Sequence, residues 1–289
     1  MLPAHLPATS VLIICFTFTF TLFTLFICQP YLFRPSNLHT CPTSQSPFGC
    51  LNFNHPLQPK LSYPILPMAH VNVPGKKTAA VIFSHGLGDT SSGWSFLIDE
   101  FGSRMPWVKW ILPNAPVQPV SLNGGLQMPS WFDLVALEPE APDDEKGLMA
   151  SVELIGRYVQ REIDNGIPPE RIIVGGFSQG ATIGVLTGLM SPHKLAGSVS
   201  LSGFLPLTDK LKDLRKPHST QLPVFWGHGT DDPLVSWGQQ SVDFLIKKLG
   251  MTKVEFKTYP NLGHSASPKE IEDMITWIGN QIPSLPAST

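Results

Sequence analysis

From residue 79 onward, short apolar runs alternate with longer stretches whose apolar residues have helical spacing. The short runs are rich in β-branched residues, which is typical of buried strands. They cover residues 79–84, 108–112, 171–175, 195–201, 223–227 and 254–259. Because several of these runs, such as 79–84 and 223–227, are apolar at successive positions rather than at every second one, they predict a sheet that is buried on both faces.

The stretches between the strands predict helices. In the longest of them, apolar residues recur every three or four positions up to Asn165-Gly166: Leu148, Val152, Ile155, Val159 and Ile163. Further helices are expected over 94–104, 179–190, 237–249 and 268–282, and residues 113–129 are expected to be a long loop. The alternation predicts an α/β fold, with a mostly parallel central sheet covered by helices on both faces.

The first quarter of the chain differs in composition from the rest. Of the 289 residues, 22 are Asp or Glu, and none of these lies in residues 1–67, which hold all four cysteines. We therefore divide the chain into residues 1–67, an apolar segment followed by a flexible Pro-rich tether, and residues 68–289, a single folded domain. The extension is expected to be non-globular.

Residues 11–28 form an uncharged apolar run, for which three interpretations remain open. The run is near the lower length limit for a membrane-spanning helix, so membrane association through these residues is one of them. A cleaved or misjudged targeting segment is the second, although no basic residue precedes the run. The third is a non-native extension, with translation starting at Met68. A mature N-terminus at Met68 would remove the anchor hypothesis.

Charge and cysteine content exclude several function classes. Lys and Arg number 20 and the net charge is −2, so nothing indicates a nucleic-acid partner. Residues 68–289 contain no cysteine, which suits a reducing compartment and excludes a thiol nucleophile there. No group of His, Asp and Glu has the spacing of metal ligands, and we predict neither a metal nor another cofactor.

The sequence Gly176-Phe177-Ser178-Gln179-Gly180 lies between a β-branched strand and a helix of small residues. G-x-S-x-G in this context is the nucleophile elbow, which presents a serine at a sharp strand-to-helix turn. The turn leaves no room for bulk two residues before and after the serine, and glycine meets that demand on both sides. We predict Ser178 as a nucleophile.

A serine nucleophile needs a histidine base, which a carboxylate must orient. After such an elbow the acid and then the base follow in sequence, each on a loop after a later strand. Only His264 has the right order and place, whereas His228 precedes both candidate acids and is interpreted as a turn histidine. Asp231 and Asp232 are adjacent, and the pattern leaves both open, with Asp232 favoured because Pro233 holds it extended.

The oxyanion formed on the attacked carbonyl requires backbone N–H donors. One should be the amide of Gln179, directly after the nucleophile. The other should come from the Gly-rich loop after the first strand, where Leu87 is best placed. His85 in the same loop is interpreted as a residue that braces the loop.

Five segments together resemble the acyl-protein thioesterase family, the small carboxylesterase and lysophospholipase branch of the α/β-hydrolases. They are HGLGD at 85–89, PSWFD at 129–133, GFSQG at 176–180, HGTDDPLV at 228–235 and GH at 263–264. The resemblance assigns the acid to Asp232. It implies amide donors at Leu87 and Gln179, a long-chain acyl thioester or ester as substrate, and a cytoplasmic protein.

The resemblance also directs attention to the loop at 118–129, which helps to cover the acyl chain in such relatives. Leu122, Leu126, Met128 and, just beyond, Trp131 are therefore candidate acyl-binding residues. The expected reaction is removal of palmitoyl-type chains from S-acylated proteins. Hydrolysis of small lipid esters by the same chemistry is the first alternative, and a catalytically silent hydrolase fold that binds a ligand is the second.

Overall fold

In the computed structural model, which describes residues 69–70, 77–138 and 141–286, strand β2 (Ala79–Ser84) is buried along its whole length. Ala80 and Ile82 belong to one hydrophobic core, and Val81 and Phe83 belong to a second. Because successive side chains of a strand point to opposite faces, this alternation places a core on each side of the sheet. The apolar runs of the sequence are thus explained by burial on both faces.

The sheet has seven strands within the described residues, in the order β1-β3-β2-β6-β7-β8-β9. All neighbouring strands are parallel except β1, which pairs antiparallel with β3. The other strands are β1 (Ala69–His70), β3 (Val108–Leu112), β6 (Ile172–Phe177), β7 (Gly197–Leu201), β8 (Val224–Gly229) and β9 (Val254–Tyr259). The prediction of a mostly parallel sheet is confirmed, and β1 was not foreseen.

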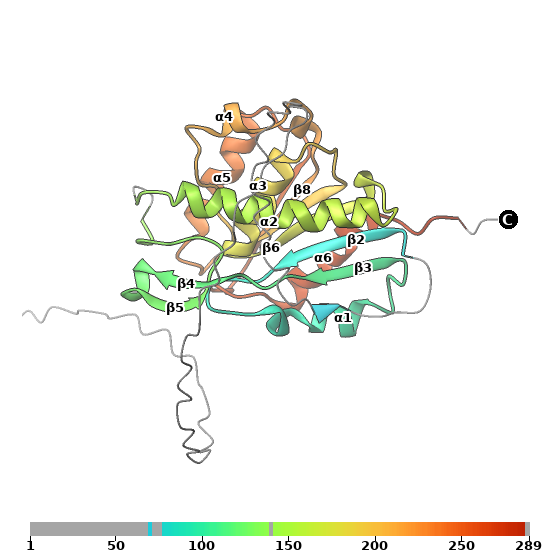
Figure 1. Cartoon of the computed structure of the whole chain (residues 1–289), viewed down its shortest axis with the longest axis horizontal. Helices are drawn as coiled ribbons and strands as arrows, with labels where there is room; N and C mark the ends of the chain where they lie inside the picture. The colour runs from blue at the N-terminus through green and yellow to red at the C-terminus, as the bar shows by residue number, and fades with distance from the viewer. Residues whose placement is uncertain (1–68, 71–76, 139–140, 287–289) are drawn as a thin grey trace, which may run out of the picture. The chain divides into compact units, whose positions relative to one another are not determined.

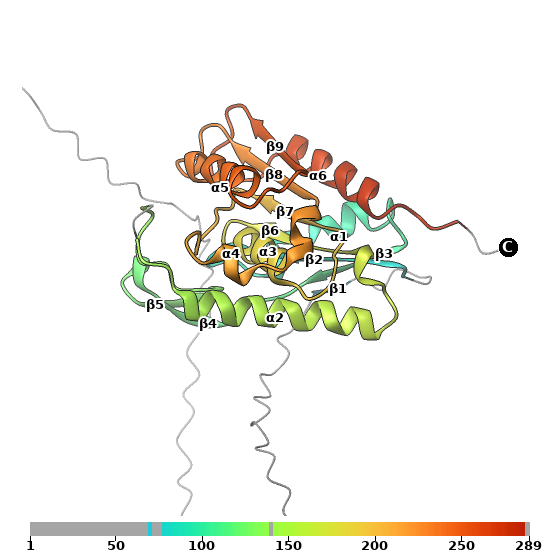
Figure 2. The same ribbon diagram turned by 90° about the horizontal axis from the view of Figure 1, so that it is seen from above.

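Helices cover both faces of this sheet (Figures 1 and 2). The core containing Ile82 also includes side chains of α2, α3 and α5, and the core containing Phe83 includes side chains of α1 and α6. The helices are α1 (Phe96–Phe101), α2 (Glu145–Asp164), α3 (Gln179–Met190), α4 (Leu211–Leu214), α5 (Val235–Lys247) and α6 (Pro268–Gln281). This two-sided packing confirms the predicted α/β class.

The predicted long loop at 113–129 is wrong from residue 117 onward, where the chain forms a hairpin. Strands β4 (Val117–Val120) and β5 (Leu126–Pro129) pair antiparallel, and Figure 1 shows them beyond the carboxyl end of β2. The turn uses Gly124 and Gly125, whose φ angles of 65° and 83° suit glycine and strain other residues. Prolines within the strands hid this hairpin from a pattern based on apolar alternation.

Several element boundaries also differ from the expectation, among them those of β8 and α1. Strand β8 continues through His228 to Gly229, so His228 is a buried strand residue and its interpretation as a turn histidine is wrong. The helix expected over 94–104 is shorter, because a 3₁₀ turn at Ser91–Trp94 precedes α1, which ends at Phe101 before Gly102.

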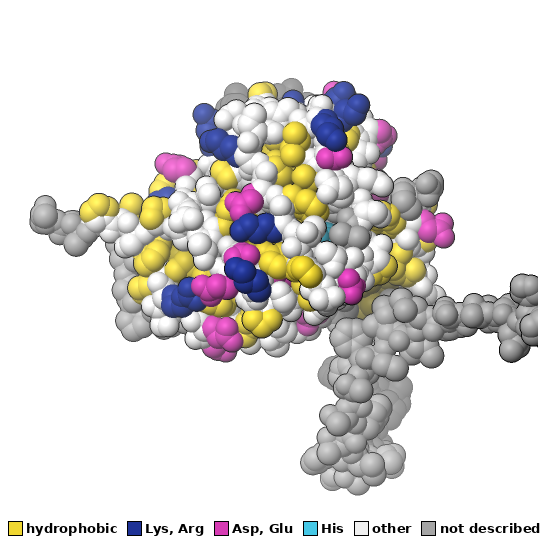
Figure 3. Space-filling model, turned by 180° about the vertical axis from the view of Figure 1, so that it is seen from behind, with side chains coloured by type: hydrophobic (Ala, Val, Ile, Leu, Met, Phe, Trp, Pro, Cys, Tyr) yellow, Lys and Arg dark blue, Asp and Glu magenta, His cyan; other side chains and the backbone are white. Residues whose placement is uncertain are grey.

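No helix within 69–70, 77–138 and 141–286 is long and apolar enough to cross a membrane. The apolar run at 11–28 and the tether that follows it lie outside the described residues. On the face drawn in Figure 3, basic side chains are interspersed with acidic ones rather than gathered into a patch of one sign.

Candidate active site

Ser178 stands between the end of β6 and the start of α3 in an unusual backbone conformation. Its φ and ψ are 53° and −119°, a region that non-glycine residues rarely occupy and that functional sites often retain. A Cβ on Gly180 would lie 2.1 Å from the backbone oxygen of Ser84, and one on Gly176 would lie 2.2 Å from the same atom. The two glycines therefore let the elbow press against β2, as the sequence motif requires.

His264 reaches Ser178 from the loop after β9. Its Nε2 lies 3.0 Å from Ser178 Oγ, and its imidazole packs against the ring of Phe177 with centroids 5.0 Å apart. The side chain of His264 is 33% exposed, so solvent and a substrate can both reach this end of the site. Residues 86 positions apart in sequence are thus within hydrogen-bond distance.

Asp232 lies on the other side of the imidazole and is fully buried. Its Oδ2 is 2.8 Å from His264 Nδ1, and its Oδ1 accepts a hydrogen bond from the Leu234 amide at 2.8 Å. His228 Nε2 lies 3.1 Å from the same Oδ2. Asp231, by contrast, is exposed and accepts a hydrogen bond from Thr230 Oγ1.

The charge of Asp232 fixes the proton on its histidine partner. Burial alone would raise the pKa of Asp232, but hydrogen bonds from His228, His264 and the Leu234 amide hold that pKa well below its ordinary value. An ionised carboxylate only accepts hydrogen bonds, so Nδ1 of His264 must donate to it. Nε2 of a neutral imidazole is then free to accept the hydroxyl proton of Ser178.

Gln179 and the loop that carries Leu87 both lie next to Ser178. Gln179 follows it as the first residue of α3, where backbone N–H groups have no intrahelical acceptor. The loop of Leu87 is held close by Gly86, where a Cβ would lie 3.5 Å from Ser178 Cβ. The Gly88 amide donates to Pro129 O at 2.8 Å, which fixes this loop to the end of β5.

His85 braces the same loop from within. Its Nδ1 donates to Gly86 O at 2.7 Å, and its Nε2 accepts from the Ala115 amide at 3.0 Å. Burial lowers the pKa of His85, so the neutral imidazole that these two bonds require is favoured.

The buried side chain of Gln179 joins the elbow to the PSWFD segment. Its Oε1 accepts from the Trp131 amide at 3.1 Å, and its Nε2 donates to Phe132 O at 2.9 Å. The sequence indicated only the backbone amide of Gln179, and nothing in the spacing of these segments signals the side-chain contacts. They give the start of α3 a fixed position relative to the loop that follows β5.

The four candidate acyl-binding side chains lie in different environments. Leu122 and Leu126 are 37% and 62% exposed on the hairpin, and Met128 is half-buried next to Gly88. Trp131 is buried in the core, and its Nε1 donates to His85 O at 2.7 Å. A side chain buried so deeply supports the loop at 85–88 from below and does not face an open groove.

A cavity of about 300 Å³ lies beside the elbow. Phe132, whose oxygen binds Gln179, and Phe204, whose oxygen binds Thr182 Oγ1, both line it and connect it to α3. The lining also includes apolar residues that the sequence did not indicate, among them Leu134, Val135, Trp237 and Phe244, together with the acidic residues Asp133, Glu138, Asp143 and Asp144. The position of Phe204 directly after β7, at the carboxyl edge of the sheet, was the one available signal.

Comparison with known proteins shows the family of this chain. The sequence profile of the phospholipase/carboxylesterase family matches residues 68–282. The chain belongs to the phospholipase/carboxylesterase family. The part that carries the fold and the site is therefore the part that defines the family, whose members are serine hydrolases.

Among curated members of the family, acyl-protein thioesterase 1 of Cryptococcus neoformans is 44% identical over 229 residues, covering 73% of this chain and 96% of the relative. Acyl-protein thioesterase 1 of Saccharomyces cerevisiae is 39% identical, covering 73% and 95%. The crystal structure of Zea mays acyl-protein thioesterase 2 is 33% identical, with a TM-score of 0.68 and coverage of 75% and 99%. The resemblance to acyl-protein thioesterases is confirmed.

Proposed function

We propose that the chain is a serine hydrolase that cleaves long-chain acyl thioesters from S-acylated proteins, with Ser178 as nucleophile, His264 as base and Asp232 as orienting acid. The observation that carries the proposal is the line of two hydrogen bonds, Ser178 to His264 at 3.0 Å and His264 to Asp232 at 2.8 Å. A relay of this geometry activates a serine hydroxyl that is otherwise a weak nucleophile.

The reaction follows from the proton positions. His264 Nε2 takes the proton of Ser178 as Oγ attacks the thioester carbonyl, and the amides of Leu87 and Gln179 receive the oxyanion. The tetrahedral intermediate expels the cysteine sulfur, which leaves as a thiol with the proton that His264 returns. Water then attacks the acyl-enzyme with His264 again as base, so that a free fatty acid departs and the Ser178 hydroxyl is restored.

The cavity beside the elbow is proposed to receive the acyl chain, with Leu122, Leu126 and Met128 of the hairpin covering its outer part. Its volume is at the lower end of the range for ligand pockets, and Phe204 and Trp237 give it aromatic walls, with ring centroids 5.5 Å apart. Each buried methylene contributes about 0.8 kcal/mol, so turnover should increase with chain length until the cavity is full.

Filling this cavity should shorten the preferred acyl chain. Leu134→Trp is expected to lower kcat/KM for a hexadecanoyl thioester about tenfold or more relative to a butanoyl thioester, because indole volume replaces space for methylenes. Leu137→Trp is the matched control, since Leu137 is exposed on the same loop and does not line the cavity. The chain-length ratio is measured for all three proteins, and an unchanged ratio in Leu134→Trp would place the acyl chain elsewhere.

The family's name favours one alternative within the same chemistry, a carboxylesterase or phospholipase that acts on small lipid esters. The acyl-enzyme is identical in both cases, and the leaving group distinguishes them. We expect the purified protein to react with a fluorophosphonate probe and to turn over a palmitoylated peptide faster than a lysophospholipid. Lipid hydrolysis faster by orders of magnitude would reverse the ranking, and a folded but unlabelled protein would favour a silent ligand binder.

The cytoplasm remains the proposed location of the catalytic domain. The support is chemical, since residues 68–289 hold no cysteine and need no oxidising compartment. Association with a membrane through residues 11–28 remains a second proposal, on residues outside the described ranges. An S-acylated substrate is itself bound to a membrane, so either arrangement is compatible with the reaction.

A further inference from the structure

Glu270 is a fully buried carboxylic acid close to the proposed triad. It lies in the first turn of α6, six residues after His264, and has no exposed surface. Neither of its carboxyl oxygens has a hydrogen-bond partner within the described residues. Burial of a carboxyl group without a hydrogen-bond partner destabilises the folded chain, so this placement calls for an explanation.

The side chain of Glu270 does not make the helix-capping contact that its position in α6 predicts. Ser267 is the N-cap of α6, and its Oγ accepts from the Glu270 amide at 3.1 Å. In a capping box the glutamate three residues after the cap reaches back to the cap amide. Here the carboxyl turns inward under β8 instead, where a Cβ on Gly227 would lie 2.4 Å from Glu270 Oε1.

This placement links the two segments that carry the base and the acid. Gly227 lies on β8, five residues before Asp232 in sequence. Glu270 lies in the first turn of α6, six residues after His264. Glycine at 227 leaves the space that the carboxyl occupies, so β8 and the start of α6 are fitted to each other at this point. A change in the charge of Glu270 is therefore expected to act on Asp232 and, through the hydrogen bond of Asp232, on His264.

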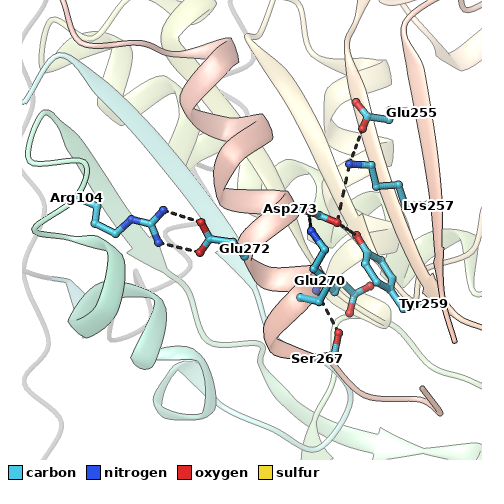
Figure 4. Close-up of polar contacts among 9 residues, drawn as sticks. Arg104, Glu255, Lys257, Tyr259, Ser267, Glu270, Glu272 and Asp273 are labelled. Atoms are coloured by element: carbon cyan, nitrogen blue, oxygen red, sulfur yellow. Dashed lines mark hydrogen bonds and ion pairs between the residues drawn. The ribbon is translucent and has the colours of Figure 1, made fainter. Parts of the chain in front are cut away.

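The charges around Glu270 are mainly negative. Figure 4 shows its side chain turned toward Tyr259, while the ammonium group of Lys257 is directed to Glu255 and Asp273. Lys269 also pairs with Asp273, at 2.6 Å, so neither lysine neutralises Glu270. The titratable groups that interact electrostatically with Glu270 are Asp232 after β8 and Tyr259 at the end of β9, and Asp232 in turn contacts both His228 and His264.

Burial, together with the negative charge of Asp232, raises the pKa of Glu270 to about 7. The carboxyl is therefore neutral in mildly acidic solution and ionises near neutrality. Burial and nearby carboxylates also raise the pKa of Tyr259, whose phenol stays neutral throughout this range. Glu270 is thus the buried group whose charge changes next to the ionised Asp232.

We propose that Glu270 is a positioning residue of the reaction, which, through the charge it carries beneath β8, sets how readily His264 accepts the proton of Ser178. The inference rests on the proposed triad. An ionised Glu270 adds a second negative charge beside Asp232, whose carboxylate holds the imidazole, and this charge favours the protonated imidazole, which cannot act as a base. A neutral Glu270 removes that charge.

The test is the pH profile of Glu270→Gln, which keeps the shape of the side chain but cannot ionise. In the wild-type protein the titrations of Glu270 and His264 are linked, so kcat/KM should fall over a broad range on the acid side of its pH profile. In the variant this acid limb should steepen to a single titration and its midpoint should fall by about 0.5–1 pH unit. KM for the long-chain acyl thioester should not change, because Glu270 does not line the cavity.

Glu272→Gln is the matched control, since it removes the same charge from α6 at a half-exposed site paired with Arg104 (Figure 4). Its profile should equal that of the wild type. An identical midpoint and slope in Glu270→Gln and wild type would overturn the inference. If Glu270→Gln does not fold, the wild-type profile decides, because a simple one-proton acid limb contradicts the linked titration.

Fluorophosphonate labelling separates the two proposals. Failure to label Ser178 at any pH would remove the triad itself. Labelling of Ser178 with the same pH dependence in Glu270→Gln and wild type would leave the triad intact and remove only the role of Glu270.

Discussion

Replacing Ser178 with alanine should lower kcat/KM for a palmitoyl thioester by a factor of about 10⁴ or more. The change removes the atom that forms the acyl-enzyme, and His264 cannot replace it as nucleophile in the same geometry. Substrate binding should survive, because the cavity and the amides of Leu87 and Gln179 remain. The measurement is steady-state hydrolysis, combined with fluorophosphonate labelling of the full chain.

Ser202→Ala provides a matched control for this substitution. Ser202 follows β7 directly with a φ of 52°, nearly the value of 53° at Ser178, so both alanine variants place a methyl group on similarly strained backbone. Ser202 has no hydrogen bond to His264. Ser202→Ala should therefore retain activity within a few fold, and comparable losses in both variants would indicate damage to the fold instead of loss of a nucleophile.

The sequence was sufficient for the elements whose burial is uniform. Strands such as β6 and β8 are enclosed on both faces, so their apolar runs are continuous and end where the chain reaches the sheet edge. The elbow was recognisable for a related reason. Its glycines are demanded by backbone atoms of the neighbouring strand, and this demand leaves a fixed local signature around Ser178.

Features that depend on distant segments escaped the sequence analysis. The cavity proposed to receive the acyl chain combines Leu134, Phe204 and Trp237, which belong to three separate segments that meet only in the folded chain. Glu270 has the spacing of a capping box, and only the packing of α6 against Gly227 shows that its carboxyl is buried. Local patterns report what a residue does to its neighbours in sequence, whereas these roles arise from tertiary packing.

The choice between the two adjacent aspartates shows where a local sequence pattern is no longer sufficient and tertiary structure is needed. The extended backbone imposed by Pro233 favoured Asp232 but left Asp231 open. In the structure Asp232 is 1% exposed and contacts His264, while Asp231 faces solvent. The catalytic role of Asp232 remains a prediction, for which the pair of aspartates supplies its own control.

Asp232→Asn should lower kcat about 10⁴-fold at neutral pH while leaving the fold in place. An asparagine amide can donate to His264 Nδ1, which places the imidazole proton on Nε2, the atom that must accept the proton of Ser178. Asp231→Asn carries the same chemical change one residue away at an exposed site and should keep nearly full activity. The two variants are compared by kcat and by the rate of fluorophosphonate labelling at one pH.

The reverse pattern, with Asp231→Asn inactive and Asp232→Asn active, would assign the acid to Asp231 and require a different arrangement of the loop after β8 during the reaction. Similar activity in both variants would mean that His264 is oriented by another group. His228 does not meet that need, because it lies 3.1 Å from Asp232 Oδ2 and is buried against Gly238 of α5. The large loss is thus expected only where the carboxylate touches the base.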